Sequence, residues 1–208
     1  VSKDIPAVEA ALCEPLSCSA YAVNQTGMGM EDTVVISGLG AIGMGMLQFA
    51  LLRNPKRVIG IDTNDALCEI AKKLGAAEVL NPMKEDVTKR IMELTDGVGC
   101  DIYMEATGNP ASVETGMNCL RKQGMLFIYS VFKKKAEIDL NQISEFKELR
   151  VIGGHLSPGA FPYTIDCLEK GKINAKVMVT DIFALNEIDE AMSAKKPDRV
   201  SIKTVLVP

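Results

Sequence analysis

The sequence of 208 residues contains no tryptophan and a single histidine, His155. Its six cysteines form no C-x-x-C pair. Because zinc sites are built from clustered cysteine and histidine, a complete metal site within these residues is not expected. No signal-peptide pattern is present either, so we expect buried thiols rather than disulfides, and a cytoplasmic location.

Long apolar runs and extended basic clusters are also missing. No stretch approaches the roughly 20 apolar residues that a membrane-spanning helix needs. The longest basic cluster is Lys133–Lys134–Lys135 and the net charge is −4, so neither a membrane nor nucleic acid is expected as a partner. A hydrophobic content of 47% with 24% charged residues is that of an ordinary globular protein, long enough to bury a proper core.

The most informative segment that is present runs from Val34 to Gly43. A β-branched apolar run ends there in G-x-G-x-x-G, and helix-forming residues follow from Ala41 to about Arg53. In a dinucleotide-binding turn Gly38 permits the tight bend, Gly40 lets the backbone approach a pyrophosphate, and Gly43 lets helix and strand pack closely. The helix N-terminus then offers N–H groups to the phosphates. The alternative is a tight strand–helix turn without a ligand.

Asp62 follows the second apolar run, Arg57–Ile61, nineteen residues past Gly43. A carboxylate at this position accepts hydrogen bonds from both ribose hydroxyls and repels a 2′-phosphate, which favours NAD over NADP. The next residues, Thr63–Leu67, supply no arginine for a phosphate. Asp62 could instead cap the following helix or bind the ribose of a methyl donor.

Strand-like and helical segments alternate along the middle of the chain. The expected strands are 34–37, 57–61, 77–80, 100–105, 125–130 and 150–154, and the expected helices are 41–53, 66–74, 84–95, 111–120 and 161–170. This pattern predicts an α/β fold, a doubly wound parallel sheet of about six strands (a Rossmann fold) with helices on both faces.

The two ends of the chain do not fit this alternation. We expect residues 1–16 to be a remnant of a second domain, 17–175 to be the nucleotide-binding domain, and 176–208 to return toward the second domain. A helix is expected at 17–25, another at 187–194, and a strand at 201–207.

Six segments, in their order and spacing, are similar to one known family. They are Ala10–Ser17, Val35–Gly43, Ala71–Ala76, Glu105–Gly108, Leu168–Ile173 and Ser201–Leu206. Together they resemble the medium-chain dehydrogenase/reductase family, in its zinc-dependent alcohol and polyol branch near the sorbitol and threonine dehydrogenases. The resemblance covers almost the whole chain, but most of the family's N-terminal catalytic domain has no counterpart here.

The resemblance implies hydride transfer between a secondary alcohol, such as a small polyol, and NAD, with zinc in the parent enzyme polarising the alcohol oxygen. Glu14 matches the third protein position at the family's catalytic zinc. Because one carboxylate is not a metal site, we expect this chain alone to hold no zinc and to have no turnover. The alternative for Glu14 is an ordinary carboxylate beside Pro15 in a first helical turn.

The resemblance also implies further cofactor contacts. Thr107 and Gly108 would lie against the adenosine and the nicotinamide ribose, and Ser130 and Val131 beside the carboxamide; core packing is the alternative for each. The first helix would contribute Ala41 as part of its glycine turn and Ile42 as a contact on the nicotinamide face.

Two basic residues, Lys203 and His155, each have two possible roles. Lys203 matches a position where relatives place a basic residue on the pyrophosphate, and it could instead be a solvated lysine. His155 lies near the expected nicotinamide end, where a structural role competes with a proton relay.

The segment Ala136–Leu140 alternates apolar and polar residues. The resemblance implies that it forms an edge strand that pairs with a second copy, which would give a homodimer or homotetramer. The alternative is a monomer whose edge is protected by Lys133–Lys135 and by the charges of Glu137 and Asp139.

Other classes of function share this glycine turn: non-catalytic dinucleotide-binding modules, zinc-free reductases and methyltransferases. The pair Glu14–Pro15 argues against the zinc-free reductases, which have no need of a carboxylate there. The segment 201–207 argues against a methyltransferase, because such a terminal return belongs to the dehydrogenase layout.

Overall fold

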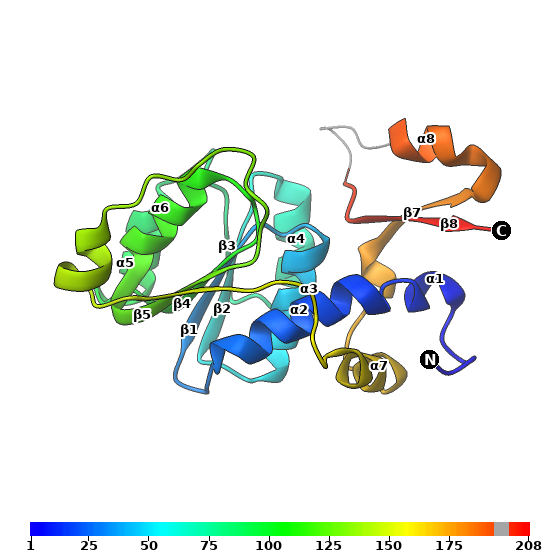
Figure 1. Cartoon of the computed structure of the whole chain (residues 1–208), viewed down its shortest axis with the longest axis horizontal. Helices are drawn as coiled ribbons and strands as arrows, with labels where there is room; N and C mark the ends of the chain where they lie inside the picture. The colour runs from blue at the N-terminus through cyan, green and yellow to red at the C-terminus, as the bar shows by residue number, and fades with distance from the viewer. Residues whose placement is uncertain (194–199) are drawn as a thin grey trace.

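The computed structural model describes residues 1–193 and 200–208, and its main feature is a parallel sheet (Figure 1). The sheet has six strands in the order β3-β2-β1-β4-β5-β6. These are β1 (Thr33–Ser37), β2 (Arg57–Ile61), β3 (Glu78–Leu80), β4 (Cys100–Glu105), β5 (Leu120–Ile128) and β6 (Arg150–Gly153). Every adjacent pair is parallel, which confirms the doubly wound fold.

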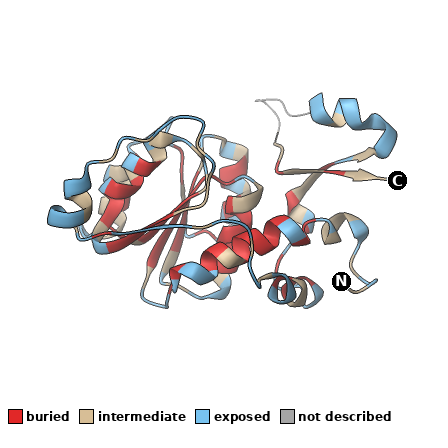
Figure 2. Cartoon of the chain, in the orientation of Figure 1, coloured by how far each residue is buried: buried red, intermediate tan, exposed pale blue. Residues whose placement is uncertain are grey.

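Helices cover both faces of this sheet. One buried cluster unites the sheet with α2 (Cys13–Thr26), α3 (Ala41–Leu52), α4 (Asp65–Leu74) and α7 (Phe161–Glu169). A second cluster, on the opposite face, includes α5 (Val87–Leu94) and α6 (Pro110–Cys119). Figure 2 shows the buried residues concentrated on the strands and on the inward helix faces. Because all six strands are parallel, their carboxyl ends lie at the same edge of the sheet. Open α/β folds bind ligands at this edge.

Local capping fixes the helix starts. Asn64 caps α4, its side chain accepting from Ala66 N–H, and Asp86 caps α5 by accepting from Lys89 N–H. The periodicity predicted that this helix begins at Lys84. It begins at Val87 because Asp86 caps it. Gly75, with φ of 115°, ends α4 in the left-handed conformation expected of a C-cap glycine.

Two elements start earlier than predicted. Helix α2 begins at Cys13 rather than Ser17, because Pro15 is compatible with a first turn and Leu16 extends the buried face. Strand β5 begins at Leu120 rather than Met125, because Leu120 already pairs with Cys100 through an irregular register.

A small unit follows the sheet domain. It contains parallel strands β7 (Val179–Ala184) and β8 (Lys203–Val207), and helix α8 (Ile188–Ser193). The last residue of the helix predicted at 187–194, Ala194, lies outside the described residues. The segment that leads into this unit is held to the sheet domain by the buried side chain of Gln48 in α3, which accepts a hydrogen bond from Asn174 N–H at 2.7 Å. The helix α1 (Ala7–Ala10) lies beside this unit, close to β8.

The edge strand predicted at Ala136–Leu140 is wrong. No strand forms there; Ala136 and Ile138 pack against the cluster beneath α5 and α6, while Leu140 is 70% exposed and begins a helical turn. Ile138 is partly buried there, so much of its apolar side chain is removed from water without strand pairing. The edge strand on this side of the sheet is β6 instead, and β3 forms the opposite edge.

Within the described residues, no helix combines the length and the apolar character needed to cross a bilayer.

Candidate functional site

The glycine turn between β1 and α3 is shaped by close backbone contacts. Gly38 has φ of +93°, and a Cβ there would lie 2.8 Å from the carbonyl oxygen of Ala106. A Cβ on Gly43 would lie 1.6 Å from the carbonyl oxygen of Gly38. In contrast, a Cβ on Gly40 would meet nothing within 4 Å. The turn needs Gly38 and Gly43 for its own packing, whereas Gly40 leaves space for something outside the chain.

The N-terminus of α3 faces that space without a protein cap. Gly40 is the N-cap residue and no side chain accepts from the first turn, which contains Ala41, Ile42 and Gly43. The first N–H groups of a helix have no intrahelical partner and carry the positive end of the dipole. This end of α3 is therefore suited to a phosphate.

Asp62 lies immediately after β2 and opposite the glycine turn. Its Oδ2 accepts a hydrogen bond from Leu39 N–H at 2.7 Å, and its Oδ1 accepts one from Asn64 N–H at 2.9 Å. Both bonds hold the carboxylate in place at the wall of a cavity.

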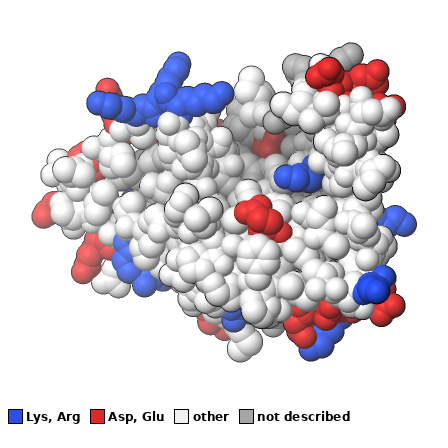
Figure 3. All heavy atoms as spheres, turned by 45° about the vertical axis from the view of Figure 1, so that its right-hand side comes forward, with Lys and Arg blue, Asp and Glu red and all other residues white. Residues whose placement is uncertain are grey.

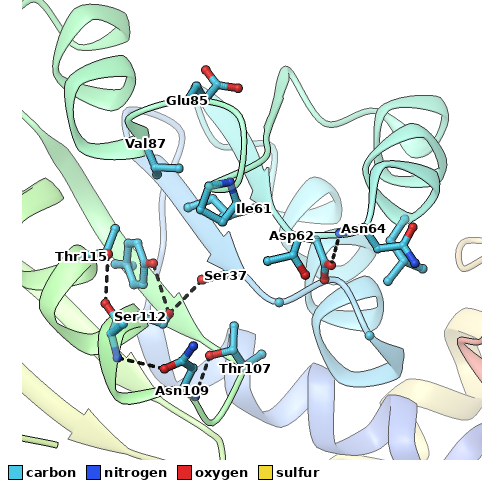
Figure 4. Close-up of a pocket in the computed structure, with 18 of the residues that line it drawn as sticks. Ser37, Ile61, Asp62, Asn64, Glu85, Val87, Thr107, Asn109, Ser112 and Thr115 are labelled. Atoms are coloured by element: carbon cyan, nitrogen blue, oxygen red, sulfur yellow. Dashed lines mark hydrogen bonds between the residues drawn. The ribbon is translucent and has the colours of Figure 1, made fainter. Parts of the chain in front are cut away.

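This cavity has a volume of about 750 Å³ and lies at the carboxyl edge of the sheet (Figure 4). It is lined by Ser37, Gly38, Gly40, Ile61, Asp62, Thr63, Asn64, Leu67, Pro82, Glu85, Asp86, Val87, Thr88, Tyr103, Ala106, Thr107, Asn109, Ala111, Ser112, Thr115 and Ser201. Three of these residues are acidic and, among the described lining residues, none is lysine or arginine. Figure 3 shows a hollow between the sheet domain and the C-terminal unit, with an acidic side chain visible inside it. The cavity therefore has the size of a nucleotide, and the described residues that line it supply no cation for an additional phosphate.

Glu105 was not identified from the sequence, although it organises the loop after β4. Its fully buried carboxylate accepts hydrogen bonds from Thr107 N–H at 2.7 Å and from Gly108 N–H at 3.1 Å, and it also bonds the Thr107 hydroxyl. Gly108 has φ of +70°, and a Cβ there would lie 2.7 Å from the carbonyl oxygen of Val131. A carboxylate at the end of a mostly apolar strand, followed by Ala-Thr-Gly, is the signal that could have revealed this role.

A cluster of hydroxyl groups at the cavity wall was also missed. The Oγ atoms of Ser37 and Ser112 are 2.9 Å apart, and Tyr103 Oη lies 3.3 Å from Ser112 Oγ. Tyr103 is almost completely buried, and this burial raises the pKa of its phenol well above the usual range. All three groups therefore stay protonated and neutral.

The remaining expected cofactor contacts divide into two groups. Thr107 lines the cavity, whereas Gly108, Ser130, Val131 and Lys203 do not. Ser130 donates a weak hydrogen bond to the carbonyl oxygen of Glu105 at 3.3 Å, and Val131 is 92% exposed. Lys203 begins β8. The C-terminal segment instead reaches the cavity through Ser201, two residues earlier.

The described residues do not bring a set of metal ligands together. Glu14 is exposed in the first turn of α2, where its carboxylate accepts a hydrogen bond from the Cys18 thiol at 3.5 Å. Burial raises the pKa of that thiol, so it stays protonated. His155 is exposed in the loop after β6. Among the described residues, no group of three or more histidine, cysteine, aspartate or glutamate side chains could hold a metal ion.

Comparison with known proteins identifies the family. The zinc-binding dehydrogenase family matches residues 41–170. The chain belongs to this family, and the resemblance to zinc-dependent medium-chain dehydrogenases is confirmed.

Among individual relatives, the chain is 40% identical over its full length to an erythritol/L-threitol dehydrogenase of Mycolicibacterium smegmatis. It is 36% identical over 88% of its length to a D-arabitol-phosphate dehydrogenase of Enterococcus avium. It spans 58% and 53% of these two proteins.

Solved structures agree with this assignment. The chain superposes with a TM-score of 0.91 on 2R,3R-butanediol dehydrogenase of Bacillus subtilis, covering 100% of this chain and 60% of that one at 26% identity. A zinc-binding dehydrogenase of Sinorhizobium meliloti 1021, solved with bound NADP, gives a TM-score of 0.93 at the same identity, with 100% of this chain and 61% of that chain covered.

Proposed function

We propose that this chain is the NAD-binding part of a zinc-dependent alcohol or polyol dehydrogenase that transfers hydride between a secondary alcohol and NAD. The observation that carries the proposal is the arrangement of Gly40 and Asp62 around one cavity, with an uncapped helix N-terminus on one side and a fixed carboxylate on the other. The division into residues 1–16, 17–175 and 176–208 belongs to the same proposal.

Each part of the cofactor has a residue suited to it. The N–H groups of Ala41 and Ile42 bind the pyrophosphate, and the carboxylate of Asp62 accepts from the ribose hydroxyls. Thr107 and Gly108, held by Glu105, border the nucleotide from the next strand. Ser130, Val131 and Ile42 orient the nicotinamide end, and Lys203 supplies a charge for the pyrophosphate.

NAD is preferred over NADP in this proposal. The 2′-phosphate of NADP would be placed beside Asp62, in a cavity that also holds Glu85 and Asp86 and that has no described basic lining residue. Like charges in a partly enclosed site are costly. A similar dehydrogenase of Sinorhizobium meliloti was solved with bound NADP, so the titration compares both cofactors.

Zinc belongs to the parent enzyme, where it would polarise the alcohol oxygen. Glu14 is the residue of this chain that we propose as one of its ligands, although the described residues alone do not complete the site. His155 is left without a catalytic role in this proposal.

We propose a small polyol as the substrate of the parent enzyme, because the relatives named above act on erythritol, threitol and arabitol phosphate. The six cysteines are buried free thiols, which fits a reducing compartment such as the cytoplasm.

Isothermal titration calorimetry of the purified chain with NAD and NADP tests the proposal. Stoichiometric NAD binding, tighter than NADP binding, supports it. Elemental analysis should find less than one zinc per chain, and NADH formation from polyols should be absent. Failure to bind either dinucleotide would overturn the proposal, and tighter NADP binding would overturn its specificity.

A further inference from the structure

The hydroxyl cluster Ser37–Tyr103–Ser112 lies in the same cavity as Asp62 but on its opposite side (Figure 4). It brings together the end of β1, the middle of β4 and the first turn of α6. The Tyr103 ring reaches this place by packing on Gly116, where a Cβ would lie 2.6 Å from the ring. Three elements thus converge to place hydroxyl groups where an apolar wall would otherwise form.

The number of protons in the cluster determines whether it donates or accepts a hydrogen bond toward the cavity. Each hydroxyl has one proton to donate, and two hydrogen bonds join the three groups, so one proton is left over. Ser37 is 3% exposed and Tyr103 is 1% exposed, whereas Ser112 is half-buried at the cavity wall. Leaving a buried donor unpaired costs about 1–3 kcal/mol.

The least costly arrangement follows from these exposures. Ser37 and Tyr103 both donate to Ser112, and Ser112 donates its own proton into the cavity. Because the Ser112 oxygen then accepts two hydrogen bonds, it has no lone pair left for a ligand. Ser112 acts as a donor only, whereas an isolated serine could either donate or accept.

We propose that Ser112 donates a hydrogen bond to a ring nitrogen of the adenine of the bound cofactor, and that Ser37 and Tyr103 are the positioning residues that make it a donor. This inference rests on the proposed function. Asp62 takes the ribose, so the base extends from it into the rest of the cavity, between walls that include Ile61 and Val87. A purine presents unprotonated ring nitrogens at its edges, which complement a donor.

The test uses AMP, which contains the base and ribose but no nicotinamide. Calorimetry should show that Ser112→Ala weakens AMP binding by about 5- to 10-fold, the effect of one hydrogen bond. Thr115→Val is the matched control: Thr115 lines the same cavity, but its hydroxyl donates to Ala111 O at 2.9 Å within its own helix. This variant should bind AMP like the wild type.

Analogues of AMP separate recognition from a merely structural effect. The wild-type chain and Ser112→Ala are titrated with 1-deaza-, 3-deaza- and 7-deaza-AMP. The analogue lacking the bonded nitrogen should bind the wild type about 5- to 10-fold more weakly than AMP does, and Ser112→Ala should not distinguish it from AMP.

The failures can be told apart. If the wild type binds NAD but Ser112→Ala binds AMP equally well, this inference is overturned while the proposed function stands. Equal losses for AMP and all three analogues in Ser112→Ala would mean that the serine only shapes the cavity, which also overturns the inference. If the wild type binds neither AMP nor NAD, the proposed function falls and this inference falls with it.

Discussion

The carboxylate of Asp62 accepts the backbone N–H of Leu39 at 2.7 Å. The residue proposed to bind the ribose therefore also fixes the middle of the glycine turn. Asp62→Ala should lose both functions and weaken NAD binding by about 1–3 kcal/mol, the scale of a lost charge-assisted hydrogen bond. Its affinity for NADP should fall less, because the repulsion of the 2′-phosphate is removed. Calorimetric titration with both cofactors measures the two changes.

Asp62→Asn is the matched control for this substitution. The amide oxygen can still accept from Leu39 N–H, but the negative charge is lost. It should keep the bond from Leu39 N–H but lose the one from Asn64 N–H, so its thermal stability should fall less than that of Asp62→Ala, and it should lose part of the NAD preference. If both variants bind NAD as tightly as the wild type does, Asp62 has only a structural role.

Gly40 and Gly43 make a second matched pair, because one faces open space and the other faces backbone. Gly40 has φ of −66°, which alanine adopts readily, and its Cβ would meet no protein atom within 4 Å. Gly40→Ala should therefore fold normally but bind NAD at least about tenfold more weakly, since its methyl group occupies the space left for the pyrophosphate. Gly43→Ala should lose more than about 3 kcal/mol of stability, because its Cβ would overlap the carbonyl oxygen of Gly38. Urea denaturation and calorimetry separate the two outcomes, and a Gly40→Ala variant with unchanged NAD affinity would place the pyrophosphate elsewhere.

Much of the sheet was predictable from the sequence, because each strand is a short apolar run bounded by polar or turn residues. Strands β2 and β4 agree to the residue with the predicted ranges 57–61 and 100–105. The alternation at Ala136–Leu140 was misleading, because period-two hydrophobicity records burial of alternate side chains but not what they are buried against. Ile138 is covered by its own domain.

The candidate site was predictable only where a single segment defines it. Gly38, Gly40 and Asp62 follow from one strand–turn–helix–strand unit, and all three line the cavity. The cluster of Ser37, Tyr103 and Ser112 needs three elements to meet, with up to 75 residues between partners. No local pattern contains that information, because serine and tyrosine in these positions are also compatible with ordinary packing.

Lys147 stabilises the sheet domain at the end of α6. Its Nζ donates to the carbonyl oxygens of Met117, Asn118 and Leu120 at 2.7, 2.9 and 2.7 Å. Partial burial lowers the pKa of this amine, but the three acceptors compensate for the loss of water. Lys147→Met should leave these carbonyls unpaired and reduce the free energy of unfolding by about 2–4 kcal/mol. Lys89→Met, at an exposed position of α5, should change it by less than about 0.5 kcal/mol in the same urea titration. Equal effects of the two substitutions would contradict this role.

Cys119 should make stability depend on alkaline pH. Burial raises the pKa of its thiol from 9.0 to about 11. The folded state therefore holds the proton more tightly than the unfolded state, so the contribution is complete below about pH 9 and is lost as the pH rises through about 11. Between these values the wild type should lose roughly 2 kcal/mol more stability than Cys119→Ala does. Urea denaturation of both proteins at about pH 8 and about pH 11 measures the difference, and parallel losses would mean that burial does not raise the pKa of this thiol in the folded state.

The final prediction concerns association through β6, one of the two edge strands of the sheet. All four residues of β6 are exposed, including Val151 and Ile152. Gly154 N–H donates to Ile128 O on the β5 side, so by alternation Ile152 N–H faces β5 and Val151 N–H faces outward. An unpaired edge of this kind is satisfied when a second copy pairs with it about a two-fold axis.

We therefore expect a homodimer, or a homotetramer built from such dimers, at micromolar concentration in light scattering. Val151→Pro removes an outward N–H without breaking a bond to β5, so it should produce a folded monomer. Val151→Thr keeps the N–H and the β-branched shape, and should remain associated. Circular dichroism verifies that both variants are folded. A monomeric wild type, or a Val151→Pro variant that associates as the wild type does, would show that β6 is not the interface.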